Sequence, residues 1–426
     1  MFNELLKQLA QAAPEHSRTA VGPVHGSAAA RLVVERAENG PLQLVITSDG
    51  QGGSQLLREM GFYARGRDLS ILRFPDWETL PYDNFSPHQD IVSERLHALH
   101  NLPSLTNGIV VVPISTLMHR LPPTEYVTGY SLVLELGQQL DLDEFRKRLE
   151  RNGYRSVDTV FEHGEYALRG SLFDIYPMGS ELPFRIDLLD DEIETLRTFD
   201  PETQRTIEQV TAIDLLPARE FALDRRSIMR FQDNWLAAFD VDHDACPMYS
   251  EVGAGRIPGG CEYYLPLFFE TCATLFDYLP DDCQVSAIGS HHSAAEQFWS
   301  EVTHRFEEYG VDPRRPLLPP TRGFLTVAEL YSELGHHHLL ELRTDADAPT
   351  HITPGLLPPP DLSLDQSARS PALRLAHFIA DHQGTVLLCA ESAGRREILL
   401  ESLAELKLHP TEYAGWDEFV ASGAAF

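Results

Sequence analysis

The run IVVVPI at residues 109–114 constrains the fold of this chain more than any other segment. It is continuously apolar and rich in β-branched side chains, which is typical of a strand buried on both faces of a parallel sheet. A second apolar run, LQLVIT at 42–47, and a shorter one at 19–24 flank the helical segment SAAARLVVERAENG. This alternation of strands and helices predicts a doubly wound α/β sheet over residues 1–130.

A helix is expected before the strand at 109–114, in the segment SPHQDIVSERLHALHNL. Ser86, Pro87 and Gln89 predict a capping box with proline at the first helical position. Ile91, Val92, Leu96 and Leu99 then recur at helical spacing.

The pattern changes over residues 131–216, where a strand (SLVLEL) precedes a helix (LDLDEFRKRLERNGY) closed by Gly153. Asp190 and Asp191 separate two strand-like segments, FRIDLL (184–189) and EIETLRTF (192–199), and this predicts a β-hairpin. We therefore expect a small α+β domain with an antiparallel sheet.

The remaining residues give fewer signals. Residues 217–350 are mixed, with a long helix expected near 292–309, and the prolines of 351–371 indicate a linker. A helix (373–382), a strand (TVLLCA) and a helix (395–406) then predict the start of a further α/β domain over 372–426. The chain stops at Gly423–Phe426 within an apolar stretch, which is typical of a partial sequence.

Composition excludes several classes of protein. A length of 426 residues predicts three domains, and no apolar run approaches the 18 residues or so that a membrane span requires. Five widely spaced cysteines favour a reducing, cytoplasmic setting over a disulfide framework or a zinc site. Binding of duplex nucleic acid depends on clustered Lys and Arg, so a net charge of −30 without a basic segment makes DNA an unexpected direct partner.

The turn from Gly22 to Ala30 is the only candidate nucleotide loop. Gly22, Gly26 and Ser27 lie between a strand and a helix, as a phosphate-binding loop does, but alanines stand where Lys and Ser/Thr are needed. The strand QVSAIGSHH (284–292) also ends without the acidic pair that holds magnesium. We therefore favour an ordinary strand-to-helix turn over a working nucleotide site, and expect no catalytic residues.

Histidines and cysteines add no site. His336–His338 and His291–His292 are consecutive, whereas zinc ligands on a helix are usually four residues apart and face one ion. We expect no metal site and no nucleophile.

Alternation within 184–189 divides that strand into two faces. Phe184, Ile186 and Leu188 are predicted to face the core, and Arg185, Asp187 and Leu189 the opposite surface. An exposed leucine beside an arginine is either an ordinary surface residue or the anchor of a partner site. The residues alone favour an ordinary surface leucine.

Several long segments resemble one family. EHGEYALRGSLFDIYPMGSELPFRIDLLDDEIETLRTFD, DWETLPYDNFSPHQDIVSERLHALHNLP, PISTLMHRLPP and GCEYYLPLFF are similar to the bacterial transcription-repair coupling factors, and the likeness covers almost the whole chain. The resemblance implies a UvrB-like degenerate motor lobe made of residues 1–130 and 217–350. It also implies an inserted UvrA-binding domain at 131–216, and moves our expectation for the outer face toward a partner site.

The family's UvrA-contacting residues carry over to Arg169, Arg185 and Leu189, although many members have phenylalanine at the last position. The resemblance further implies that ATP and magnesium, RNA polymerase and DNA are bound by downstream domains absent from this chain, and that a C-terminal domain masks the UvrA face. A DNA-remodelling enzyme driven by ATP at the Gly22–Ala30 turn is the alternative.

Overall fold

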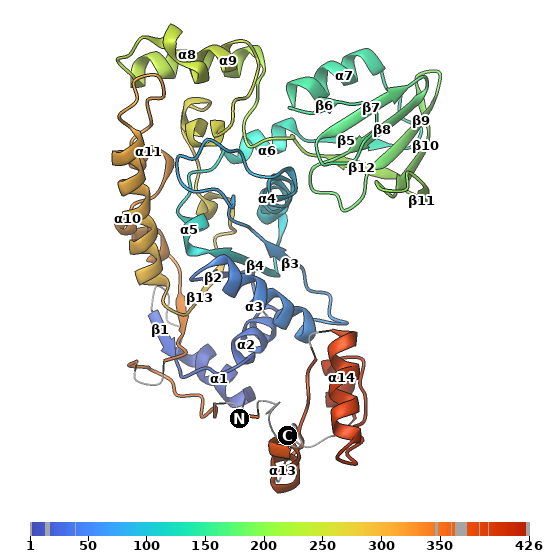
Figure 1. The fold of residues 1–426 in the computed structure, drawn as a ribbon, viewed down its shortest axis with the longest axis vertical. Coiled ribbons are helices and arrows are strands. Elements are labelled where there is room, and N and C mark those ends of the chain that lie inside the picture. The colour runs from blue at the N-terminus through green and yellow to red at the C-terminus, as the bar shows by residue number, and fades with distance from the viewer. Residues whose placement is uncertain are drawn as a thin grey trace.

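The computed structural model describes residues 2–12, 18–38, 40–345, 348–358, 360–362, 373–382, 384–390 and 392–422. Within them lie two six-stranded sheets and one two-stranded sheet. One large sheet is parallel and the other is almost entirely antiparallel, so the expected α/β organisation with a second, antiparallel unit is confirmed. Figure 1 shows the antiparallel unit projecting to one side of the parallel-sheet lobe.

The parallel sheet has the strand order β1-β14-β13-β2-β4-β3. Its strands are β1 (Arg18–Val21), β2 (Gln43–Thr47), β3 (Ile71–Arg73), β4 (Ile109–Pro113), β13 (Gln284–Ile288) and β14 (Leu339–Leu342). β2 and β4 lie side by side and each has a strand on both sides; Gln43 is opposite Ile109, and every residue of both strands is buried. The double-faced burial expected for 109–114 is therefore confirmed.

Helices cover both faces of this sheet. Val45 and Val111 pack with α1 (Phe2–Ala12), α2 (Ala28–Glu38) and α3 (Gly50–Tyr63). Leu44 and Val110, one residue earlier on the same strands, pack on the opposite face with α4 (Gln89–Asn101), α5 (Ile114–Leu117) and α10 (His291–Tyr309). Alternate side chains of one strand thus pack into two separate hydrophobic cores, one on each face of the sheet.

The start of α4 differs from the sequence prediction. The helix begins at Gln89 with His88 as its N-cap, not at a capping box formed by Ser86. The Ser86 hydroxyl instead donates to the buried carboxylate of Glu262 at 2.8 Å. A tertiary hydrogen bond to a distant segment has therefore replaced the local cap.

The antiparallel sheet has the order β11-β10-β9-β8-β7-β6. Its strands are β6 (Arg155–Ser156), β7 (Glu165–Arg169), β8 (Leu172–Tyr176), β9 (Phe184–Leu189), β10 (Glu192–Phe199) and β11 (Thr206–Gln209), and only β6 and β7 run parallel. Helix α7 (Leu142–Arg151) contributes Phe145 to the inner face, where its ring lies 5.2 Å from that of Phe173. β5 (Leu132–Glu135) and β12 (Ala212–Leu215) pair at the base of the unit.

The predicted hairpin of β9 and β10 is present, with one irregularity. Leu189 pairs with Glu192, but Asp187 pairs with Thr195 because Glu194 forms a bulge. Strict pairing from the same turn would place Arg185 opposite Leu196. The bulge places it opposite Arg197 instead, so Arg197 shares the face of Arg185.

The antiparallel unit is fixed to the parallel-sheet lobe through α4. The Gly179 amide donates to the Ser93 hydroxyl at 2.8 Å, and His163 Nδ1 lies 2.7 Å from an Asp90 carboxylate oxygen. Gly179 has a φ of +81°, and a Cβ there would come within 2.8 Å of Leu216. Only glycine fits this close approach.

Further helices complete the lobe. They are α6 (Thr124–Tyr130), α8 (Arg225–Ala238), α9 (Pro247–Gly253), α11 (Pro320–Gly323), α12 (Val327–Leu334) and the 3₁₀ segments η1 (Leu102–Ser104), η2 (His243–Ala245), η3 (Cys261–Leu267) and η4 (Leu275–Tyr278). The helix expected near 292–309 is confirmed as α10. No helix in the described part of the chain is long and apolar enough to cross a membrane.

The C-terminal part contains α13 (Leu373–Asp381), α14 (Ala393–Ala404) and α15 (Trp416–Ala421). The strand predicted at TVLLCA is wrong, because residues 385–390 have no strand structure. A β-strand requires a neighbouring strand for its hydrogen bonds, and this segment pairs with none. The predicted linker pairs at its start with β1, through an Ile352–Val21 bridge, while 363–372 and the chain end at 423–426 lie outside the described residues.

Candidate functional site

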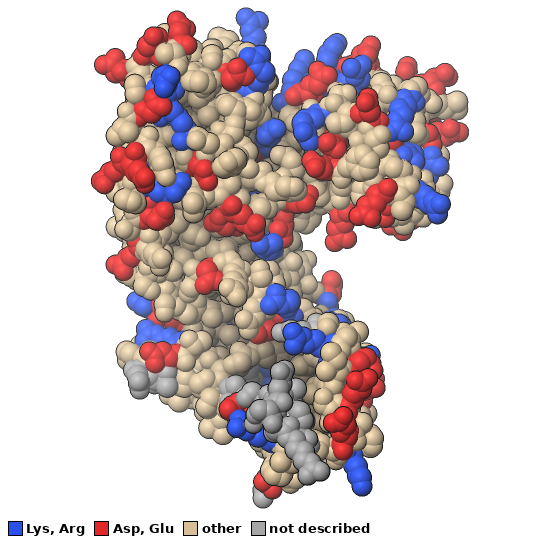
Figure 2. All heavy atoms as spheres, in the orientation of Figure 1, with Lys and Arg blue, Asp and Glu red and all other residues tan. Residues whose placement is uncertain are grey.

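The outer face of the antiparallel sheet carries the residues singled out from the sequence. Registered pairs place Asp174, Arg185 and Arg197 in one row across β8, β9 and β10. The next row holds Arg169, Leu172, Asp187 and Thr195. In Figure 2 basic and acidic groups are interspersed over this unit, which lies at the upper right. We call these two rows, together with Leu189, the outer face.

Leu189 and Arg169 are the exposed members of this face. Leu189 is 62% exposed at the end of β9, whereas the inner residues Ile186 and Leu188 are buried as predicted. Arg169 donates through Nη2 to the Asp158 carbonyl oxygen at 2.8 Å and lies two strands away from β9, about 10 Å across the sheet. Both side chains are thus open to an approaching partner.

Arg185 is held much more tightly than the sequence indicates. Its Nε and Nη2 donate to the two carboxylate oxygens of buried Asp174 at 2.7 and 2.9 Å, and its guanidinium lies 4.6 Å from the Phe199 ring centre. The side chain is 15% exposed. Hydrogen bonding to Asp174 raises the pKa of Arg185 above its usual value. Arg185 therefore organises the face as well as lying on it.

Arg197 is a member of this face that sequence reasoning missed. Its Nη2 contacts an Asp187 carboxylate oxygen, which also accepts a hydrogen bond from the Thr195 hydroxyl at 3.0 Å. The side chain is 29% exposed, and its Nε is buried with no hydrogen-bond partner among the described residues. Buried residues of a regular strand are two positions apart, but Ile193 and Leu196 are three apart. This spacing was the signal of a bulge in the sequence.

The candidate nucleotide loop has its side chains engaged in packing. Gly22 is joined to Pro23 by a cis peptide bond, and a Cβ on Gly22 would lie 2.9 Å from the Arg343 carbonyl oxygen. Gly26 has a φ of +55°, and the Ser27 hydroxyl lies 2.8 Å from the Tyr63 hydroxyl. The Tyr63 ring in turn packs edge-on against Trp416, with 5.1 Å between centres. The Ser27 hydroxyl is thus engaged by an aromatic side chain of the lobe.

The end of β13 carries buried histidine in place of the acidic pair. His291 lies 3.1 Å through Nε2 from Glu341, and Glu341 also contacts Arg18 and Arg343. Burial alone would raise the pKa of Glu341, but hydrogen bonds from His291, Arg18 and Arg343 outweigh it and lower the pKa to about 2. Sequence reasoning missed this carboxylate because it lies on β14. Its oxygens are committed to three cationic or hydrogen-bonding partners.

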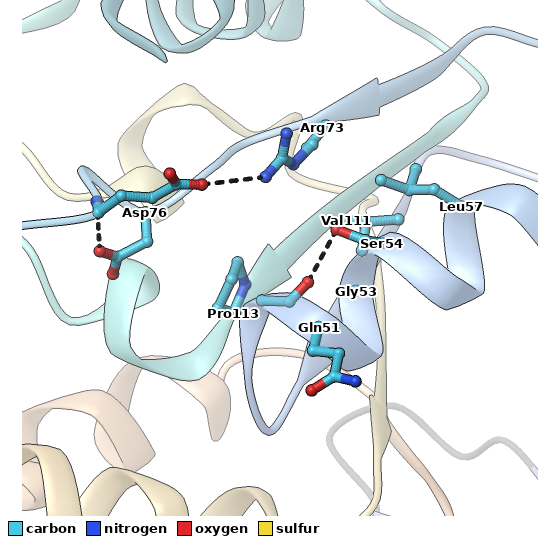
Figure 3. A pocket seen from close by; sticks show the side chains of 10 residues that line it. Gln51, Gly53, Ser54, Leu57, Arg73, Asp76, Val111 and Pro113 are labelled. Atoms are coloured by element: carbon cyan, nitrogen blue, oxygen red, sulfur yellow. Dashed lines mark hydrogen bonds and ion pairs between the residues drawn. The ribbon is translucent and has the colours of Figure 1, made fainter. Parts of the chain in front are cut away.

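A cavity of about 280 Å³ opens at the carboxyl end of β4, between the start of α3, the helix that follows β2, and the segment that follows β3. Figure 3 shows Gln51 and Ser54 of α3 on one side and Arg73 and Asp76 on the other. Such crevices between strands whose following helices leave to opposite faces are common ligand sites. Arg73, however, is paired with Glu94 at 3.2 Å and Glu78 at 3.9 Å. The cavity therefore presents no surplus positive charge for a phosphate group.

No cluster of three or more His, Cys, Asp or Glu side chains with metal-binding geometry occurs within the residues that the structure describes. The five cysteines form no disulfide. Burial raises the pKa of the thiols of Cys261, Cys272 and Cys283, which keeps them protonated and poorly nucleophilic.

Two family models match the chain. Residues 132–221 match the UvrB interaction domain, and residues 378–426 match the MFD D3 domain. The first match coincides with the antiparallel unit and so includes the whole outer face.

Three curated relatives from different bacteria carry the same name. The transcription-repair-coupling factor of Escherichia coli (strain K12) is 44% identical over 93% of this chain, and that of Haemophilus influenzae is 40% identical over 92%. The Bacillus subtilis protein of the same name is 29% identical over 57% of the chain. The chain spans 35% and 34% of the length of the first two relatives, about a third of each.

Proposed function

This chain is a homologue of the transcription-repair-coupling factors along nearly its whole length, and from that premise we propose that it recruits UvrA through the outer face of its antiparallel sheet. In this role the chain recruits the excision-repair protein UvrA in transcription-coupled nucleotide excision repair. The observation that carries the proposal is the coincidence of the UvrB interaction domain with a sheet that exposes Leu189 beside arginines. Leu189 supplies the apolar anchor and Arg169 charge-assisted hydrogen bonds, while Arg185, largely engaged with Asp174, adds positive charge to the contact.

The remaining partners rest on the family resemblance of the sequence and are proposals at the level of the whole protein. We assign the binding of RNA polymerase, DNA, ATP and magnesium to further domains of the whole protein. We also propose that a C-terminal domain masks the outer face and that the protein acts in the cytoplasm. Within this chain we divide the motor-like lobe into 1–130 and 217–350, the UvrA-binding domain at 131–216, the linker at 351–371 and the next domain from 372.

The alternative of an ATP-driven enzyme acting from the Gly22–Ala30 turn has less support. The Ser27–Tyr63 hydrogen bond and the absence of lysine from the turn both oppose phosphate binding there. Titration with a fluorescent ATP analogue tests it directly. Saturable, magnesium-dependent binding by this chain would favour the enzyme, and we expect no such binding.

Binding of purified UvrA to this chain, measured by titration calorimetry, tests the recruitment proposal. We expect Arg169→Ala and Leu189→Ala each to weaken binding by about 1–3 kcal/mol, because both side chains are exposed and can contact a partner. Val133→Ala, at another exposed apolar position of the same domain, is the matched control and should leave affinity unchanged. Full affinity in both outer-face variants would contradict the proposal.

Arg185 needs a different design. Arg185→Ala would leave the carboxylate of Asp174, which is 2% exposed, buried without its partner, so a loss of binding could reflect damage to the sheet. The pair Arg185→Ala with Asp174→Asn removes both charges together. We expect this double variant to remain folded and to bind UvrA more weakly than wild type.

A further inference from the structure

Arg185 and Arg197 face each other across β9 and β10 as a registered pair. Directly opposed side chains on one face lie about 5 Å apart at Cβ, and like charges in that position destabilise the pair. The sheet compensates with one carboxylate for each, Asp174 for Arg185 and Asp187 for Arg197. Arg185 is bound to its aspartate by more hydrogen bonds than Arg197 is, and this difference indicates different roles for the two arginines.

Three of the five N–H donors of Arg185 are engaged inside the domain. Two parallel hydrogen bonds join it to Asp174, and Nη1 donates to the Gln204 carbonyl oxygen at 3.2 Å. Both acceptors belong to the same folded unit. Arg185 therefore has little left to offer as a bidentate ligand.

The guanidinium of Arg197 is engaged through fewer of its nitrogens than that of Arg185. A single nitrogen, Nη2, contacts Asp187, and Nε has no partner within the described residues although it is buried. An unsatisfied buried donor is costly and uncommon in folded proteins. Asp187 keeps the hydroxyl of Thr195 as a second donor, so Arg197 can leave it without stranding an unpaired carboxylate.

We propose that Arg197 is a direct contact residue for UvrA, whose guanidinium fork turns outward to grip a partner aspartate or glutamate between β9 and β10. This inference rests on the proposed recruitment of UvrA. A carboxylate matches the planar fork with two parallel hydrogen bonds, which a lysine cannot supply.

The charge of the outer face supports an acidic partner group. Its two central rows contain three arginines and two aspartates, a local excess of one positive charge on a chain of net charge −30 (the residues are Arg169, Arg185, Arg197, Asp174 and Asp187). A carboxylate placed beside Arg197 would also relieve the opposition of the two arginines. The rest of the chain carries a net negative charge, which opposes the approach of the same group.

Four variants of the full chain, titrated with purified UvrA, test the inference. Arg197→Ala should raise Kd roughly 10- to 100-fold, the usual effect of losing charge-assisted hydrogen bonds. Arg197→Lys should restore little of the affinity, because it keeps the charge but loses the fork. Arg151→Ala, on the exposed side of α7, removes an arginine elsewhere on the domain and should bind like wild type.

Asp187→Asn distinguishes direct contact of Arg197 with UvrA from a role in which Arg197 only holds Asp187 in position. If Arg197 contacts UvrA, this substitution removes its internal competitor and affinity is kept or increased. If Arg197 only holds Asp187 in place, Asp187→Asn and Arg197→Ala weaken binding alike, and that result overturns the inference. Thermal unfolding of each variant, with Arg197→Gln in reserve should the alanine variant be unstable, confirms that folded proteins are compared.

The outcomes for the two proposals are distinct. Wild-type binding with full affinity in Arg197→Ala removes Arg197 from the contact while leaving recruitment intact. Absence of binding by wild type removes both. Weakening by Arg197→Ala and preservation in Asp187→Asn support both.

Discussion

Glu341 joins three elements of the parallel-sheet lobe through one carboxylate. It lies on β14 between β1 and β13, and it contacts Arg18 at the sheet edge and His291 at the start of α10. Its pKa of about 2 lies below the ordinary value of 4.5, so its ionised form is favoured by folding. The stabilisation is therefore complete above about pH 4.5 and is lost as the pH falls toward 2.

This linkage gives a prediction at the scale of a single residue. Glu341→Gln should lower the free energy of unfolding by about 2–3 kcal/mol at pH 7, and the difference from wild type should shrink steadily below pH 4.5. Urea denaturation from pH 7 to pH 3 measures it. Glu301→Gln, half-exposed on α10, is the control and should track wild type at each pH. A difference that stays constant down to pH 3 would show that the pKa of Glu341 is not depressed.

At the scale of elements, the hairpin of β9 and β10 shows where a bulge decides the face of a residue. Because Glu194 has no partner on β9, deletion of Glu194 should leave Leu196 opposite Ile186 and Arg197 opposite Arg185. We expect that variant to fold with a loss of about 1 kcal/mol or less. Deletion of Thr198, beyond the bulge, should turn Phe199 toward the wrong face and cost about 3 kcal/mol or more.

Thermal unfolding of the two deletion variants measures this contrast. Each lacks one residue from the same strand, so they serve as controls for one another. Equal destabilisation would mean that Glu194 is needed for the twist of the hairpin and is more than an unpaired insertion.

The same hairpin marks how far the sequence could predict the structure. Alternation correctly assigned Ile186 and Leu188 to the core and Leu189 to the surface, because β9 is regular. Arg197 could not be placed by alternation, since the bulge reverses the face of every residue after Glu194. The buried strands β2 and β4 were predictable for the opposite reason: both faces are covered, so continuous apolarity is sufficient.

Long-range partners were beyond sequence reasoning. The cap of α4 was misplaced because Ser86 bonds Glu262, 176 residues away in the chain. The strand expected at TVLLCA had suitable residues but no neighbouring strand to pair with. Local propensity predicts which segments are suited to an element, while tertiary partners decide whether it forms.

At the scale of the whole molecule, a buried ion pair lies where the chain returns from the antiparallel unit. Arg95 of α4 donates through Nε to Glu220 at 2.5 Å, and both side chains are almost completely buried. Trp77 also donates its indole N–H to Glu220 at 3.1 Å. The pair connects the first piece of the parallel-sheet lobe to the segment that follows the inserted domain.

This position leads to a prediction about cooperativity. Arg95→Ala or Glu220→Ala should each cost about 3–5 kcal/mol, because each strands a buried charge, and Arg95→Met with Glu220→Leu should cost less than either. One apolar core runs from β2 and α4 into β8 and β9, so both sheets should unfold together in every variant. Urea denaturation read by tryptophan fluorescence follows the lobe, because none of the four tryptophans lies within 131–216. Hydrogen exchange of β9 and β10 follows the inserted domain. Separate midpoints in the wild type would mean that the inserted domain unfolds independently of the lobe, and that the ion pair stabilises the lobe alone.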